Sequence, residues 1–238
     1  MKLAIVTTTW GRPGVTSIVL DHFASMDVGG LDISIFAAVS PEDEFVRQNT
    51  EAILNAGGTV VTMPNDNLAG KWNAVMKEAA DSGADYILVV GSDNVVNAAF
   101  LFEAVALLSE NDCAEASVVH FYEIETGRMI YRHLNQCGIR MFRGNSVRVL
   151  DGKLWDDSNP KKRGMDGAQD KVIKKVFDIE KIGWPSAAVC LDIKHPTVYR
   201  VQFRRYMNNL QGETVEAKTF LDSHFPGLSD RISRLRAL

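Results

Sequence analysis

Short apolar runs alternate with amphipathic segments from the N-terminus to residue 108. Four mostly apolar runs, at 3–6, 33–39, 59–63 and 86–90, predict strands of the kind that are covered on both faces. Strands that alternate with single helices need parallel βαβ crossovers, so we predict an α/β fold on an open, doubly wound sheet. The helix after each run is predicted by apolar residues at helical spacing, with these inward positions: Ile18, Val19, His22, Phe23 and Met26; Val46, Thr50, Ile53 and Leu54; Trp72, Val75, Met76, Ala79 and Ala80; Leu101, Ala104, Val105 and Leu108.

The pattern changes after residue 115, where strand-like segments follow one another. Segments at 116–124 and 129–134 flank Glu125-Thr126-Gly127-Arg128, which predicts a hairpin. The rest of the chain predicts, in order, a strand at 138–143, a short helix from Asn145 to Leu150, a polar loop at 151–164, a helix opened by Asp166 and buried through Val172, Ile173, Val176 and Phe177, a strand at 187–193, and a polar tail from Arg200 that is helical in pieces. We therefore expect one domain with a C-terminal part appended to it.

Composition and charge are those of an ordinary globular protein. The 238 residues are 46% hydrophobic and 24% charged, and the formal net charge of −4 argues against a strongly basic nucleic-acid binder, though a local basic face is compatible with it. Cys113, Cys137 and Cys190 show no metal-ligand spacing and no even count, so we expect buried thiols in a reduced compartment. No apolar segment approaches the roughly 20 residues that span a bilayer, and we predict a cytoplasmic protein.

Polar residues gather where the predicted parallel strands end. The segments after the four strands are 7–14, 40–43, 64–71 and 91–94, and ligands of open α/β sheets bind outside these carboxyl ends. They offer hydroxyls, carboxylates, Arg12, Lys71 and a helix N-terminus near Asn67, which together suit a nucleotide and its phosphates. Neither GxGxxG nor a Walker A sequence follows the first strand, which argues against dinucleotide-binding and P-loop proteins.

Two stretches resemble the GT-A glycosyltransferases, particularly those of family 2. They are NLAGKWNA at 67–74 and GADYILVVGSDN at 83–94, where the family has an asparagine-bearing loop and helix and then a strand that ends in Asp-x-Asp. More loosely, CGIRMFR at 137–143 and GMD at 164–166 resemble the acceptor-side strand and the Glu-Asp motif. The resemblance implies a GT-A fold, which is Rossmann-like with a mostly parallel sheet and a small antiparallel acceptor-side part.

The resemblance also implies boundaries and a metal site. The GT-A domain would span 1–196, with a nucleotide-sugar half at 1–97 and an acceptor half at 98–196, before a C-terminal helical extension at 197–238. Gly91 stands where the first acid of Asp-x-Asp is usual, so Asp93 would bind Mn²⁺ or Mg²⁺ with His195 as second ligand. Such an ion would neutralise the departing diphosphate. The plainer interpretation of His195 is a loop residue before a proline.

A general base is implied at the start of the helix after the polar loop. Asp166 would take the proton of the acceptor hydroxyl in an inverting, single-displacement reaction, and Asp170 is the fallback. Met165 stands where the family usually has glutamate, so the assignment rests on spacing and on Gly164. The alternative is that Asp166 only stabilises a helix N-terminus.

The donor, a UDP-sugar by preference, would be held by Thr8, Arg12, Glu42, Asn67, Lys71, Ser92 and Asp93, with Asp66 as a further candidate. Lys71 either contacts the diphosphate or is solvated, and we expect Trp72 in the core rather than as a stacking platform. On the acceptor side lie basic residues interleaved with aromatic ones: Lys161, Lys162, Arg163, Arg200, Arg204 and Arg205. They suit either a solvated face, contacts to the donor diphosphate, or a phosphate-bearing acceptor such as DNA with a hydroxymethylated base.

Three hypotheses follow for function. The first is a metal-dependent, inverting glycosyltransferase that moves a sugar from a nucleotide-diphosphate sugar to an acceptor hydroxyl. Soluble glycosyltransferases of this size include enzymes that modify the DNA of bacterial viruses, so a hydroxymethylated base in phage DNA is a candidate acceptor. The second is a nucleotidyltransferase on a related sheet, although the segment at 7–14 fits its glycine-rich loop only in part. The third is an inactive nucleotide- or glycan-binding module on the same fold.

Overall fold

The structure is a computed structural model that describes residues 1–135, 137–158, 165–183, 185–195 and 213–236. The first part alternates strands and helices as the sequence predicts, in the order β1 (Lys2–Thr8), α1 (Pro13–Ala24), β2 (Asp32–Val39), α2 (Val46–Asn55), β3 (Thr59–Thr62), α3 (Leu68–Asp81) and β4 (Tyr86–Val89). A short strand and a helix follow, β5 (Asn94–Val96) and α4 (Ala98–Leu107).

The second part is richer in strands. Its elements are β6 (Cys113–Ala116), β7 (Val118–Glu123), β8 (Met129–His133), β9 (Arg140–Arg143), α5 (Gly144–Val149), α6 (Met165–Ile173), β10 (Ile179–Ile182), β11 (Cys190–Lys194), β12 (Glu213–Val215), α8 (Ala217–His224) and α9 (Leu228–Arg236). The predicted hairpin is confirmed as β7 and β8, which pair antiparallel. The helical pieces of the tail are confirmed as α8 and α9.

The main sheet has seven strands in the order β10-β6-β9-β4-β1-β2-β3. β1 pairs parallel with both β2 and β4, and β2 pairs parallel with β3, so the chain reverses its direction of advance at β1. β9 is antiparallel to its neighbours β4 and β6. This is the doubly wound, mostly parallel sheet with a small antiparallel part that the sequence predicts.

A second sheet of five strands runs in the order β12-β8-β7-β11-β5. The predicted strand at 116–124 is wrong in one respect, because β6 belongs to the main sheet and β7 to the second sheet, with Ser117 between them. β10, at the edge of the main sheet, was not predicted. An apolar run shows that a segment is buried but does not show which sheet it joins.

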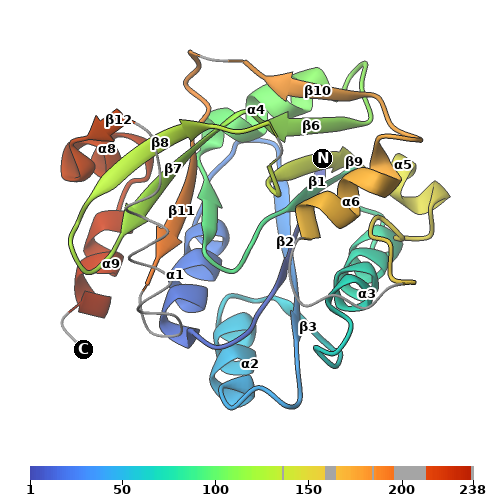
Figure 1. Cartoon of the computed structure of the whole chain (residues 1–238), viewed down its shortest axis with the longest axis horizontal. Helices are drawn as coiled ribbons and strands as arrows, with labels where there is room; N and C mark the ends of the chain where they lie inside the picture. Colours follow the sequence, from blue (N-terminus) through green and yellow to red (C-terminus); the bar gives the residue numbers. More distant parts are fainter. Residues whose placement is uncertain (136, 159–164, 184, 196–212, 237–238) are drawn as a thin grey trace.

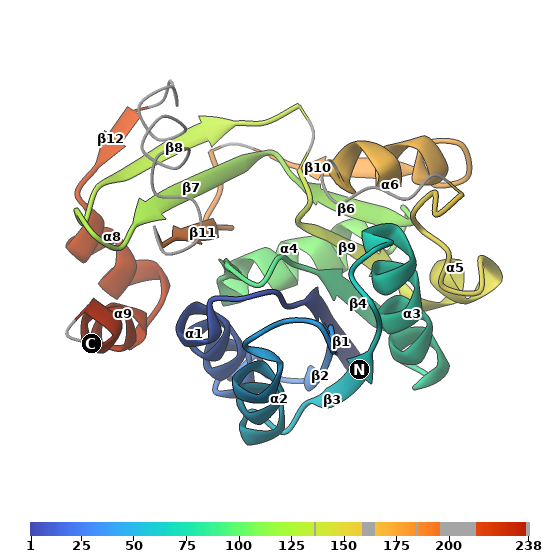
Figure 2. The ribbon, with the colours of Figure 1, turned by 60° about the horizontal axis from the view of Figure 1, so that its bottom comes forward.

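Helices cover the main sheet on both faces (Figures 1 and 2). α1 and α2 lie together on one face, and α3 and α5 lie on the other, next to α6. α9 packs on α1, and Leu221, Phe225, Leu228 and Ile232 of the tail join the larger of two apolar cores. The three cysteines are buried, as predicted. None of the helices in the described ranges is long and apolar enough to cross a membrane.

Two predicted core positions are wrong. Leu54 is 58% exposed, because Ile53 is the residue of α2 that faces the core and the next side chain of a helix points about 100° away from it. Val176 is 53% exposed and lies beyond the end of α6. Helical periodicity cannot show where a helix ends against its neighbours.

Candidate functional site

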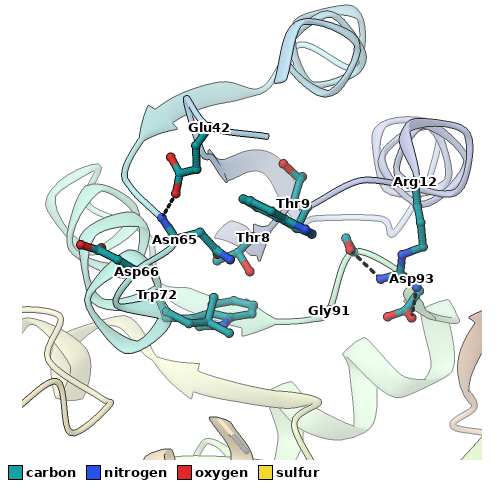
Figure 3. Close-up of a pocket in the computed structure, with 12 residues that line it drawn as sticks. Thr8, Thr9, Arg12, Glu42, Asn65, Asp66, Trp72, Gly91 and Asp93 are labelled. Atoms are coloured by element: carbon teal, nitrogen blue, oxygen red, sulfur yellow. Dashed lines mark hydrogen bonds and ion pairs between the residues drawn. The ribbon is translucent and has the colours of Figure 1, made fainter. Parts of the chain in front are cut away.

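A cavity of about 700 Å³ lies at the carboxyl ends of β1 to β4, where the strand order of the main sheet reverses (Figure 3). Small-ligand sites typically occupy about 300–1,000 Å³ and lie at this point of open α/β sheets. Glu42 and Asp66 lie on one side in Figure 3, Arg12 and Asp93 on the other, and Thr8 between them. The lining residues are Thr8, Thr9, Trp10, Arg12, Glu42, Asn65, Asp66, Leu68, Trp72, Gly91, Ser92 and Asp93.

The loop between β1 and α1 presents Arg12 from a left-handed backbone. Its φ of 45° and ψ of 48° are uncommon for a residue with a side chain, and such conformations persist where the surroundings hold them. Buried Asp43 accepts from Gly11 N–H over 2.8 Å and from Asn49 Nδ2 over 3.1 Å. Asn49 Nδ2 also donates to Gly11 O over 3.2 Å. Asp43 and Asn49 thus hold the loop, and the sequence analysis missed both because nothing local marks them.

Two cations contact one carboxylate oxygen of Asp93. Arg12 Nη1 donates to Asp93 Oδ2 over 2.8 Å, and Lys194 Nζ donates to the same oxygen over 3.2 Å. Lys194 Nζ also lies 2.6 Å from Oδ1 of Asp192. Arg12 Nη2 reaches the hydroxyl of Ser92 over 3.4 Å. The structure therefore brings Arg12, Ser92 and Asp93 together as candidates and adds Lys194 and Asp192, which the sequence analysis missed.

The charges of this cluster shift its carboxylates in opposite directions. Burial opposes the charge of Asp93, but Lys194 and Arg12 outweigh burial and hold the pKa of Asp93 well below its usual range. Burial raises the pKa of Asp192, Lys194 opposes that rise, and the neighbouring Asp93 charge adds to it. Asp93 is thus an anion that orients two cations, whereas Asp192 is the carboxyl that takes up a proton more readily.

Gly91, in place of the first acid, is part of a tight turn. Asn94 N–H donates to Gly91 O over 3.0 Å, and Asn94 Oδ1 accepts from Gly91 N–H over 3.0 Å. A Cβ at Gly91 would lie 2.6 Å from Asn94 Oδ1 and 3.1 Å from Asp93 Oδ1. An acid at this position would therefore have to displace Asn94.

Lys71 is fully buried behind the cavity. Its Nζ donates to Thr9 O and to Ser40 Oγ, over 2.7 Å in both cases, and so connects the ends of β1 and β2. Burial lowers the pKa of Lys71 to about 8, against the opposing charges of Asp43 and Glu42. Of the two alternatives for Lys71, solvation is therefore wrong, while a contact with a diphosphate stays a prediction.

The loop before α3 is held by side chains of its own and by the chain at 155–157. Asn67 caps α3, since its Oδ1 accepts from Gly70 N–H over 3.0 Å, and its Nδ2 donates to Asp157 O over 3.1 Å. Glu42 accepts from Asn65 N–H. Trp72 stacks on Trp155 with ring centroids 5.1 Å apart, and it also lines the cavity. Trp72 is thus a core residue, as expected, with one face toward the site.

His195 lies on the far side of Arg12. It lines a second cavity of about 550 Å³ together with Arg12, Pro13, Gly14, Val15, Glu44, Phe45 and Leu235. Burial and the neighbouring Arg12 charge lower the pKa of His195. Arg12 lines both cavities.

The residues around Asp93 do not fit a divalent ion in the arrangement that the structure has. Mn²⁺ and Mg²⁺ need several oxygen ligands around them. Asp93 Oδ2 is already shared by Arg12 and Lys194, which repel a further cation. Within the described part of the chain no group of three or more His, Cys, Asp or Glu side chains is placed to hold a metal ion. The Asp93 and His195 metal site stays a prediction from sequence.

The candidate base lies at the start of α6. Asp166 belongs to the first turn of this helix, and its side chain lies outside the described part of the structure. The helix is fastened by buried Arg140, which contacts Asp170 and pairs with Glu115 over 2.7 Å. Although burial opposes its charge, Lys174 and Arg140 lower the pKa of Asp170. The fallback residue Asp170 is thus engaged in holding α6.

The basic residues predicted on the acceptor side lie outside the described residues. They are Lys161, Lys162, Arg163, Arg200, Arg204 and Arg205.

This fold is the GT-A fold of the nucleotide-sugar transferases. No protein-family model and no curated protein matches the chain. The solved structures of similar fold include residues 1–349 of S. aureus TarS in complex with UDP, with 14% identity and a TM-score of 0.56 over 100% of this chain and 72% of that one. They also include the mannosyltransferase PcManGT from Pyrobaculum calidifontis in complex with GDP-Man and Mn²⁺, with 12% identity and a TM-score of 0.57 over 98% and 73%. This chain spans 44% of the longer TarS chain.

Proposed function

We propose that this protein is a glycosyltransferase that moves a sugar from a nucleotide-diphosphate sugar, by preference a UDP-sugar, to an acceptor hydroxyl. The observation that carries the proposal is the cavity at the strand-order reversal, which has the carboxylates of Glu42 and Asp66 at one side and the Arg12–Asp93 pair at the other, with Lys194 behind Asp93. Carboxylates suit the N–H groups of a base and the hydroxyls of a ribose, and the cations suit a diphosphate. The GT-A fold supports the same conclusion.

In this proposal the two sides of the cavity bind different parts of the donor. Thr8, Glu42 and Asp66 contact the nucleoside, and Trp10 offers a ring face to the base. Ser92 and Arg12 contact the diphosphate, next to Asp93. Asn67 and Lys71 stabilise the loops around the donor, since Asn67 caps α3 and Lys71 connects the ends of β1 and β2.

The transfer is proposed to be inverting. The acceptor oxygen attacks C1 of the sugar, the bond from C1 to the phosphate oxygen breaks, and its electron pair leaves with the diphosphate. Asp166 takes the proton of the attacking hydroxyl. The divalent ion predicted on Asp93 and His195 does not fit the arrangement around Asp93, and no step of this proposal needs it.

The acceptor and the setting are proposed from sequence alone. A hydroxymethylated base in phage DNA remains the candidate acceptor, approached through Lys161, Lys162, Arg163, Arg200, Arg204 and Arg205, and the enzyme would act in the cytoplasm. The sugar is expected to be a hexose. The acceptor rests on the charge and aromatic content of the segments named, the setting on the lack of an apolar run long enough to span a bilayer, and the hexose on the resemblance to GT-A enzymes.

A panel of UDP- and GDP-sugars tests the proposal. We expect one donor to be hydrolysed slowly, with release of the nucleoside diphosphate, and its sugar to reach a 5-hydroxymethylpyrimidine DNA acceptor. Release of pyrophosphate from a nucleoside triphosphate would instead identify a nucleotidyltransferase. Nucleotide binding without turnover of any donor would identify an inactive binding module. A protein that binds no nucleotide at all would contradict all of these functions.

A further inference from the structure

Lys194 brings an ammonium group to the place where two carboxylates meet. Its Nζ lies 3.2 Å from Asp93 Oδ2 and 2.6 Å from Asp192 Oδ1, and Arg12 Nη1 lies 2.8 Å from the same Asp93 oxygen. The four side chains are only 12% to 24% exposed. Two cations therefore face two carboxylates in a poorly solvated cluster, beside the cavity that Arg12, Ser92 and Asp93 line.

The backbone fixes this arrangement from two directions. Asp192 is paired with Asn94 where β11 runs antiparallel to β5, and Ile193 N–H donates to Asp93 O over 2.7 Å. Lys194, the last residue of β11, therefore lies next to the turn that contains Asp93. On the other side, the left-handed backbone of Arg12 is held by the contacts of Gly11 with Asp43 and Asn49. Both cations reach Asp93 from elements that are themselves fixed by hydrogen bonds.

The same turn disfavours the ligand set of a metal site. Gly91 has no room for an acid unless Asn94 moves, since a Cβ there would lie 2.6 Å from Asn94 Oδ1. A divalent ion at Asp93 would also stand within a few ångströms of the Lys194 and Arg12 charges, in surroundings that screen charge poorly. Both facts favour a site in which the positive charge next to Asp93 comes from Arg12 and Lys194 and not from a bound ion.

We propose that Arg12 and Lys194 neutralise the donor diphosphate in place of a divalent ion, so that donor binding and transfer need no metal; this inference rests on the proposed function. When the bond from C1 to the phosphate oxygen breaks, the electron pair leaves with the diphosphate, and the guanidinium and ammonium groups donate hydrogen bonds to its oxygens. Asp93 holds both cations before the donor binds, Arg12 at the wall of the cavity and Lys194 next to it. Asp93 is thus a positioning residue, and Lys194 is a binding residue.

Titration calorimetry with UDP, or with GDP if the donor panel selects it, tests the inference in EDTA and in MnCl₂. We expect the wild-type protein to bind the nucleotide with the same affinity in both buffers, and Lys194→Met to lose roughly ten-fold or more of it, as removal of one charged hydrogen bond implies. Lys181→Met, an exposed lysine on β10, is the control and should bind like wild type. Binding that requires Mn²⁺ would overturn the inference and leave the proposed function standing, whereas absence of nucleotide binding in both buffers would overturn both.

Binding of Mn²⁺ alone gives a second readout that does not depend on turnover. Electron paramagnetic resonance of Mn²⁺ should show the ion free in the presence of wild-type protein. Lys194→Ala should bind Mn²⁺ more tightly than wild type, because Asp93 and Asp192 then lose a shared cation. Tight Mn²⁺ binding by the wild-type protein that Asp93→Asn abolishes would contradict the inference.

Discussion

Arg12 and Asp93 form an ion pair at one side of the cavity, with Nη1 2.8 Å from Oδ2, although they are 81 positions apart in the chain. Arg12 lies in the loop after β1 and Asp93 lies in the turn after β4. These two strands are neighbours in the sheet. The pair therefore exists because parallel pairing of β1 and β4 brings their carboxyl ends together. It links the loop that enters α1 to the turn that leaves β4.

Arg12→Gly removes the guanidinium of Arg12 and keeps the left-handed backbone of the loop. Glycine adopts the left-handed conformation without strain, which offsets part of the stability lost with the Arg12–Asp93 pair, so we expect a melting temperature only slightly below that of wild type. The affinity for UDP should fall roughly 10- to 150-fold, because a hydrogen bond to a charged group contributes about 1.5–3 kcal/mol. Asp151→Gly is the matched control, since Asp151 also has a positive φ, of 49°, and lies outside the cavity. If Arg12→Gly keeps wild-type affinity, the assignment of Arg12 to the diphosphate is wrong.

Trp10→Ala tests the base-binding side of the cavity. Trp10 lines the cavity and is 40% exposed, so its removal should leave the free energy of unfolding nearly unchanged. Stacking of a base on an aromatic ring contributes about 1–3 kcal/mol, which corresponds to a loss of roughly 5- to 150-fold in UDP affinity. Phe102→Ala, at an aromatic residue of α4 that is 51% exposed, is the control. Equal affinities for both variants and wild type would exclude stacking on Trp10.

Asp166→Asn should reduce transfer and spare donor binding. A positioned general base contributes about 10²- to 10⁴-fold to the rate, so we expect a loss of that size in kcat at unchanged UDP affinity. Asp170→Asn should behave differently, because it removes one partner of the buried pair with Arg140 and so costs about 3–5 kcal/mol in the free energy of unfolding. Chemical denaturation and single-turnover rates distinguish the two variants. Full activity in Asp166→Asn would refute its role as base.

Lys71→Met should alter the pH dependence of stability. The folded pKa of Lys71, about 8, lies below the unfolded value of 10.5, so the unfolded state binds more protons between these pH values. The free energy of unfolding of the wild-type protein therefore rises between pH 8 and pH 10.5. Lys71 contributes roughly 3 kcal/mol to this rise, at 1.36 kcal/mol per unit of pKa shift. Lys71→Met should lack this rise. Lys175→Met, an exposed lysine beyond α6, should keep it. Parallel stability curves for wild type and Lys71→Met would show that Lys71 titrates normally.

The order of elements and the location of the site could be predicted because both follow from local patterns. Apolar runs indicate the parallel strands whatever their neighbours are, and polar residues at strand ends indicate the binding edge of any doubly wound sheet. Thr8, Arg12, Glu42, Ser92 and Asp93 lie in these segments, the resemblance to GT-A enzymes assigned them to the donor, and all of them line the cavity.

The assignment of strands to sheets could not be predicted. β6 and β7 are separated by Ser117 alone, yet they join different sheets, and no periodicity marks that change. The support of the Arg12 loop was missed for a similar reason. Asp43 and Asn49 are ordinary polar residues in the sequence, and their role arises only where β2 and α2 pack beside the loop.

The sequence by itself determined the α/β fold, the edge of the sheet that carries the candidate site and the Asp93 carboxylate at one side of it. Only the tertiary structure decided what surrounds that carboxylate. Lys194 lies 101 positions from Asp93 and reaches it because β11 pairs with β5 in a register that sets Asp192 opposite Asn94. Register between strands distant in sequence depends on the packing of the whole chain, so the charge that meets Asp93 is a property of the fold.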